Sequence, residues 1–323
     1  MTRETIERHQ VWFYLAAIVT GLGLGAVAPG VGSAMETLLW PTLAALLYVT
    51  FTQVPLNHLP EAFRDVRFMA AILLVNFILV PFLVWGLLLV VPDQPAVRLG
   101  VLLVLLVPCT DWFITFTHLA RGDTRRAIAV TPVNLLVQIA LLPLYLWMFM
   151  GESFAEILSA DRIVTVFVVL IGVPLTLAFL TEVWSERPGA RASVVERLVW
   201  FPVPLLALVV FLIAGSQVEA VAGSLPVLGH VLLAFLLFLV GAAVIGIVVA
   251  RLFSLPVPQA RTLVFSVATR NSFVVLPFAL ALPAVWDVAV IVIVFQSLVE
   301  LFGMVGFLWL VPRKLLPLPA PST

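Results

Sequence analysis

Charged residues are scarce in this sequence. Asp, Glu, Lys and Arg make up only 11% of its 323 residues, whereas a soluble globular domain carries about a quarter. Hydrophobic residues make up 63% of the chain, and the mean hydropathy is +1.20. This composition excludes an ordinary soluble protein and predicts an all-α integral membrane protein with almost no extramembrane domain.

Several chemical signatures are also missing. The single cysteine, Cys109, excludes an internal disulfide and any metal site built from several thiolates. The chain has no glycine-rich phosphate loop, paired-histidine metal motif or nucleophile elbow. We therefore expect no metal, no cofactor, no nucleic-acid partner and no ATPase activity in this chain. The expected environment of the chain is the lipid bilayer.

What the chain has instead is a series of long apolar runs separated by charged or proline- and glycine-containing connectors. These runs predict about ten transmembrane helices. They lie near residues 11–29, 37–55, 67–91, 97–119, 127–150, 162–183, 198–215, 227–250, 261–282 and 285–311. Five spans fall in each half, which predicts two repeats, residues 1–150 and 151–323, within one membrane domain.

Basic residues predict the orientation of these spans. All but three of the 17 Lys and Arg residues lie in the N-terminal segment, in alternate connectors or after the last span; the exceptions are Arg98, Arg162 and Arg270. Because basic connectors stay in the cytoplasm, we expect cytoplasmic N- and C-termini in a multi-pass protein of the plasma (inner) membrane. Five is an odd number, so the two repeats would have opposite orientations, as in many secondary transporters.

The predicted fourth span is polar near its middle. Seven apolar residues, Val101 to Val107, are followed by Pro108, Cys109, Thr110 and Asp111. Proline removes a backbone donor and breaks a helix, and broken backbone at membrane depth occurs only inside protein or beside a wet cavity. The stretch therefore predicts half of a transport site.

An inverted repeat predicts a counterpart of this break in span nine. There the polar residues Thr269, Arg270, Asn271 and Ser272 interrupt an apolar segment, and Pro277 follows. Two interrupted spans at matching positions are the best sequence indication of a binding site at the bilayer midplane. We expect the two broken spans to cross there.

Three segments resemble the arsenite permeases of the bile acid:sodium symporter superfamily: VPCTDWFITFTHLARGD, FSVATRNSFVVLPFALA and QSLVELFGMVGFLWLVP. The resemblance covers about residues 97–150 and 261–312. It implies that Cys109 matches the functional cysteine of that family and Glu300 its membrane-embedded glutamate. Two positions differ from it: Asp111 stands where a small apolar residue is usual, and Arg270 where a second Asn or Gly is usual.

These residues define the candidate site. The substrate-binding residues are predicted to be Cys109, Thr110, Asp111, Arg270 and Asn271, and the ion-coupling residues Gln296 and Glu300. A thiolate suits a soft metalloid, although a lone cysteine is also often a small buried apolar residue. Isolated charges in a membrane are costly, so we expect Asp111 and Arg270 to form an ion pair that ties the broken spans together.

Span five contributes a further polar row. Thr131, Asn134 and Gln138 lie at helical spacing, which is compatible either with hydrogen bonds between helices or with contacts to a ligand.

Two transport functions are compatible with this site. The first is efflux of arsenite or a related metalloid by alternating access, as an antiporter coupled to protons through Glu300. The alternative is sodium-coupled symport of an organic anion, with Arg270 contacting the anion. An enzyme is not expected: Asp111 and His118, the nearby acid and histidine, are seven residues apart, about two helical turns and too far for a catalytic hydrogen bond.

Overall fold

The computed structural model describes residues 3–54, 65–151, 168–185 and 197–318. Within these ranges the chain is helical and has no β-strand, as predicted. Six helical segments are long and apolar enough to cross a membrane. They are α1 (Arg3–Val27), α2 (Gly32–Phe51), the joined α4 (Val66–Leu74), η3 (Val75–Leu79) and α5 (Val80–Leu87), α8 (Thr124–Met150), α14 (Val218–Leu252), and the joined η5 (Ala284–Trp286), α17 (Asp287–Leu310) and η6 (Val311–Leu315).

The remaining apolar segments form shorter helices. They are α6 (Pro95–Leu105), α7 (Trp112–Leu119), η4 (Val168–Gly172) with α11 (Val173–Ser185), α13 (Pro202–Ser216), α15 (Val257–Ala268) and α16 (Ser272–Leu280). The spans expected at 97–119 and 261–282 are thus each found as two short helices with a break between them, α6–α7 and α15–α16.

Part of the sequence-based plan falls outside the described residues. The start of the sixth expected span and the polar connector before it, residues 152–161, lie there. So do several of the basic residues that predict the orientation: Arg64, Arg162, Arg187 and Arg191. The expected orientation of the termini therefore stays a prediction.

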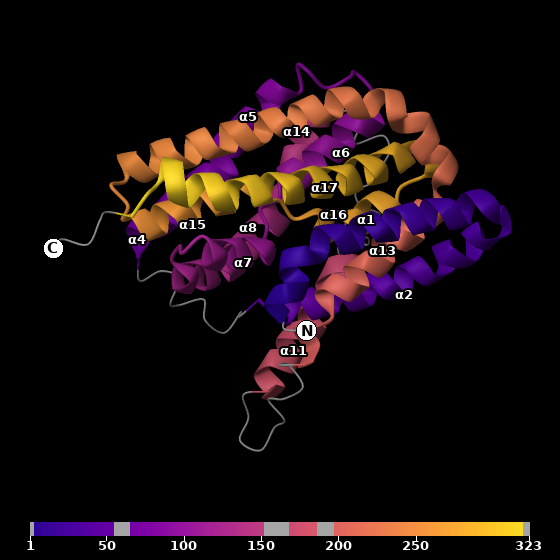
Figure 1. Cartoon of the computed structure of the whole chain (residues 1–323), viewed down its shortest axis with the longest axis horizontal. Coiled ribbons are helices and arrows are strands. Elements are labelled where there is room, and N and C mark those ends of the chain that lie inside the picture. The colour runs from indigo at the N-terminus through magenta and orange to yellow at the C-terminus, as the bar shows by residue number, and fades with distance from the viewer. Residues whose placement is uncertain (1–2, 55–64, 152–167, 186–196, 319–323) are drawn as a thin grey trace.

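Four helices form a smaller group (Figure 1). Helix α13 packs against both α1 and α2, and α11 lies against α2. Gly21 and Gly25 of α1 permit this close approach, because a Cβ atom at these positions would collide with the carbonyl oxygens of Phe211 and Gly215 in α13. Small residues are a common means of packing membrane helices closely.

The other helices form a larger group. Helix α14 packs against α15 and α17, α17 packs against α6 and α16, and α8 packs against α6, α7 and α15. Figure 1 shows α14 (orange) and α17 (yellow) running nearly parallel along one side of the molecule. The smaller group meets the larger one where α1 touches α14 and α17 and where α2 touches α16.

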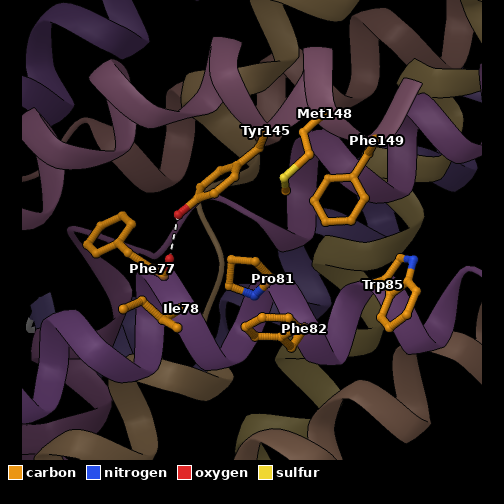
Figure 2. Close-up of a pocket in the computed structure, with 8 residues that line it drawn as sticks. All are labelled: Phe77, Ile78, Pro81, Phe82, Trp85, Tyr145, Met148 and Phe149. Carbon is orange, nitrogen blue, oxygen red and sulfur yellow. Dashed lines mark hydrogen bonds between the residues drawn. The ribbon is translucent and has the colours of Figure 1, made fainter. Parts of the chain in front are cut away.

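Proline shapes the third span. Pro81 has no N–H to bond the carbonyl of Phe77 four residues earlier, and the backbone widens into a π-turn at Val75–Leu79. The hydroxyl of Tyr145 in α8 donates to this freed carbonyl at 2.5 Å (Figure 2). The bond lies at an apolar groove of about 370 Å³ in which Phe82 and Trp85 are 66% and 64% exposed, so these rings lie on the surface of the molecule.

A polar cluster joins the starts of α4 and α8. Asp65 caps α4 by accepting from the N–H of Phe68 at 3.1 Å, and it accepts from Nε of Arg126 at 2.7 Å. Arg126 also pairs with Asp123, the cap of α8. Burial raises the pKa of the Asp65 carboxyl group, but the hydrogen bonds from Phe68 and Arg126 outweigh burial, so this pKa lies below its ordinary value of 3.8.

Candidate functional site

The breaks of the two interrupted spans cross, as predicted. The N–H of Cys109 donates to the carbonyl of Thr269 at 3.1 Å, and the N–H of Asn271 donates to the carbonyl of Val107 at 2.8 Å. These bonds form an isolated antiparallel bridge between Pro108 and Arg270. Each break thereby satisfies backbone groups of the other, which is what allows non-helical backbone inside a membrane protein.

Cys109 lies at the N-terminus of α7. The residue is only 3% exposed, and it precedes Asp111, the N-cap of α7, by two positions. The backbone N–H of Cys109 bonds the carbonyl of Thr269, and the N–H of the next residue, Arg270, bonds Glu300. The thiol is therefore inside the crossing, together with the two acidic residues that the sequence singled out.

Thr110 and Asn271 join the two breaks through their side chains. The Asn271 amide donates to the Thr110 hydroxyl at 3.1 Å, and its oxygen accepts from the N–H of Val274 at 3.3 Å, which caps α16. Asn271 is thus held at the start of a half-helix, where backbone N–H groups point toward the crossing.

Glu300 reaches the crossing from α17. Its Oε2 accepts from the backbone N–H of Arg270 at 2.9 Å and from the Gln296 amide at 2.7 Å. Gln296 in turn accepts from the Ser272 hydroxyl at 3.0 Å. The other oxygen of Glu300, Oε1, is buried and has no hydrogen-bond partner in the part of the chain that the structure describes. One oxygen is therefore fixed, and the other has capacity for a proton or a ligand.

The expected ion pair between Asp111 and Arg270 is wrong. The Arg270 guanidinium donates to the Asn76 side-chain oxygen at 2.9 Å and to the carbonyls of Ser266 and Leu105 at 2.8 and 3.3 Å. It also donates to the carbonyl of Val267 at 2.5 Å. Among the described residues no salt bridge joins it to Asp111. Carbonyls three and four residues earlier on the same chain hold the charge instead.

Asn76 is a site residue that the sequence did not predict. This residue is fully buried in the π-turn of span three, where its amide donates to the hydroxyl of Ser266 at 3.0 Å and its oxygen accepts from Arg270. The available signal was a single amide in the apolar run VNFIL. π-turns inside helices often occur at functional sites.

Span five presents two amides without partners. Both side-chain polar atoms of Asn134 and both of Gln138 are buried and make no hydrogen bond to any described residue. Thr131, by contrast, bonds the carbonyl of Ala127 at 2.9 Å. Buried polar groups are nearly always paired, so the ligand-contact interpretation of Asn134 and Gln138 is favoured over bonds between helices.

Three aromatic rings pack together beside the crossing. Trp112, which follows Asp111, packs edge-on against Phe273, which follows Ser272, with centroids 5.1 Å apart. Tyr14 of α1 stacks on Trp112 at 6.1 Å. The second contact places a residue of the smaller group against Trp112, the first residue of α7.

Two comparisons with known proteins bear on the identity of this chain. The chain is 20% identical over 317 residues to the arsenical-resistance protein Acr3 of Corynebacterium glutamicum. The alignment covers 93% of this chain and 83% of that protein. This distant relationship extends through both broken spans. The family model described as the Sodium Bile acid symporter family matches residues 40–224, more than half of the chain. The protein is a multi-pass membrane transporter that belongs to the sodium bile acid symporter family.

Proposed function

We propose that this protein exports arsenite, or a related metalloid, by alternating access and in exchange for protons. The observation that carries the proposal is the position of the one cysteine, Cys109, inside the crossing of two broken helices. The distant relationship to an arsenical-resistance protein supports the same cargo. A thiolate is a soft ligand of the kind that soft metalloids prefer.

The site residues suit arsenous acid, a small uncharged molecule with three hydroxyl groups. The Cys109 thiol replaces one hydroxyl: an As–S bond forms, an As–O bond breaks, and water leaves. A remaining hydroxyl has a buried acceptor in Oε1 of Glu300, whose other oxygen bonds the N–H of Arg270 at the crossing. A single thiol gives a reversible bond, which a carrier needs in order to release its cargo.

Glu300 provides the coupling in this proposal. Its Oε2 is occupied by the Arg270 N–H and the Gln296 amide, which leaves Oε1 for either a proton or a cargo hydroxyl. Protonation turns this acceptor into a donor, so proton and cargo compete for one oxygen. Such competition is the requirement for antiport.

The proposed architecture is ten spans in two inverted repeats, residues 1–150 and 151–323. In support, the smaller helix group takes α1 and α2 from the first half and α11 and α13 from the second. The larger group takes α4–α5, α6–α7 and α8 from the first half and α14, α15–α16 and α17 from the second. Alternating access then arises from movement of one group against the other, with both termini in the cytoplasm.

The second candidate is sodium-coupled symport of an organic anion. It is favoured by the family to which the chain belongs and by the oxygen-rich set of Thr110, Asn271, Gln296 and Glu300 at the crossing. In this alternative Glu300 contributes to a sodium site instead of carrying a proton.

Transport into everted membrane vesicles distinguishes the two functions. We expect radiolabelled arsenite uptake that follows an imposed pH gradient, is independent of sodium and is abolished by Cys109→Ser at an unchanged protein level. Cys109 is the sole cysteine, so maleimide labelling reports on it alone, and arsenite should slow this labelling whereas taurocholate should not. Full arsenite transport by Cys109→Ser, or sodium-driven uptake of taurocholate by the wild type, would refute the proposal.

A further inference from the structure

Two half-helices end at the crossing. The last residue of α6 is Leu105, and Ser266 and Val267 belong to the last turn of α15. The final carbonyls of a helix have no partner within that helix and carry its partial negative charge. Two negative helix ends therefore point to one place inside the membrane protein.

The head group of Arg270 occupies that place. Its terminal nitrogens donate to the carbonyls of Leu105, Ser266 and Val267 and to the side-chain oxygen of Asn76. The ring of Phe238 lies 5.4 Å from the guanidinium carbon, and the residue is only 2% exposed.

This set of contacts is unusual for arginine. Guanidinium groups usually bind carboxylates or phosphates in a bidentate manner. Here, among the described residues, every oxygen that accepts a hydrogen bond from the guanidinium is neutral. Glu300 bonds Arg270 at its backbone N–H and not at its guanidinium. Backbone carbonyls at the C-terminal ends of half-helices, with an added side-chain oxygen, are the ligands with which secondary transporters coordinate small cations.

We propose that Leu105, Ser266, Val267 and Asn76 form a site for a monovalent cation, and that this chain fills the site permanently with its own guanidinium. A covalently attached cation is not exchanged with either side of the membrane, so the site cannot draw energy from a sodium gradient. Arg270 accordingly acts as a fixed charge and not as a contact with an anionic substrate. Only the link to proton coupling rests on the proposed function; the cation site itself does not.

The proposal predicts what happens when the head group is removed. Arg270→Met keeps an unbranched stem but has no charge and no donor, so the four oxygens become available to Na⁺. Arg270→Lys keeps an attached cation. Arg261→Met is the matched control, because Arg261 is also 2% exposed and donates to the carbonyls of Ala120 and Leu316, but at helix ends next to the charged connectors and not at the crossing.

The test measures the thermal unfolding midpoint of the purified full-length variants in 150 mM NaCl and in 150 mM choline chloride, concentrations of roughly the physiological ionic strength. We expect Na⁺ to raise the midpoint of Arg270→Met by about 2–5 °C. The wild type, Arg270→Lys and Arg261→Met should shift by less than about 1 °C between the two salts.

Three outcomes would overturn the proposal. One is a folded Arg270→Met protein whose midpoint is the same in both salts. Another is an equal Na⁺ shift in the wild type or in Arg270→Lys, which would place the sodium elsewhere. The third is an Arg270→Met protein that is unfolded in both salts, because the vacated site would then fail to accept a free cation. Since the measurement reads cation binding and not arsenite transport, its failure is separable from that of the proposed function.

Discussion

Asn76 and Arg270 should be energetically coupled, whereas Asp111 and Arg270 should not. The Asn76 oxygen lies 2.9 Å from Nη2 of Arg270, and the two residues are 0% and 2% exposed. A buried hydrogen bond to a charged group contributes about 1.5–3 kcal/mol. Arg270→Met also leaves the carbonyls of Leu105, Ser266 and Val267 without this donor, so its total loss should be about 3–5 kcal/mol.

The assay is a double-mutant cycle on the free energy of unfolding in mixed detergent micelles, with choline chloride as the salt. Asn76→Leu and Arg270→Met together should destabilise less than the sum of the single variants, by about 1.5–3 kcal/mol. The matched cycle with Asp111→Asn and Arg270→Met should be additive within about 0.5 kcal/mol. Additivity in the first cycle, or strong coupling in the second, would refute the assignment of the contacts that hold Arg270.

Three further predictions concern other parts of the molecule. Glu300→Gln should make vesicle transport insensitive to an imposed pH gradient, because the amide keeps the shape but loses the titratable proton; transport that still follows the gradient would assign the proton to another group. Gly25→Ala should lower the free energy of unfolding by roughly 1–3 kcal/mol, because the added Cβ collides with α13. Gly23→Ala is the control and should be neutral, because its Cβ would have no heavy atom within 4 Å. Equal effects of the two substitutions would contradict this packing. Asp65→Asn should be less stable than the wild type at pH 7, and the two unfolding midpoints should converge as the pH falls below 3.8. A carboxyl group with a lowered pKa stabilises the fold fully above its ordinary pKa and loses this contribution as it is protonated. A difference in midpoint that persists at low pH would exclude the charge as the cause.

The crossing was predictable because its cause is local and general. Pro108 and the polar residues after it cannot continue a helix in a membrane, and the same holds for Thr269 to Asn271. When two such breaks lie together, the free backbone N–H and carbonyl groups of one can bond those of the other. The backbone bonds of Cys109 and Asn271 are of this kind. Glu300 and Gln296 were predictable from their polarity, and the structure brings both to this crossing.

The partner of Arg270 was not predictable from charge alone. Asp111, a carboxylate in the other broken span, was the expected partner, but the direction of the side chain decides which acceptors the guanidinium reaches. The carbonyls of Ser266 and Val267 are only four and three residues away on the same chain. Asn76 was overlooked because its position depends on the π-turn, and that turn arises from packing and from the missing N–H of Pro81.

The two main-chain bonds at the crossing also have a consequence for biosynthesis. Cys109 and Val107 find their partners in Thr269 and Asn271, segments about 160 residues apart along the chain. At synthesis rates of about 5–20 residues per second, the first break waits roughly 8–30 s for the second. During that time its N–H and carbonyl groups need water, lipid head groups or the insertion machinery as substitutes. The first half should therefore be a poor substrate for stable insertion alone, and separately expressed halves should rescue each other only when both are made in the same cell.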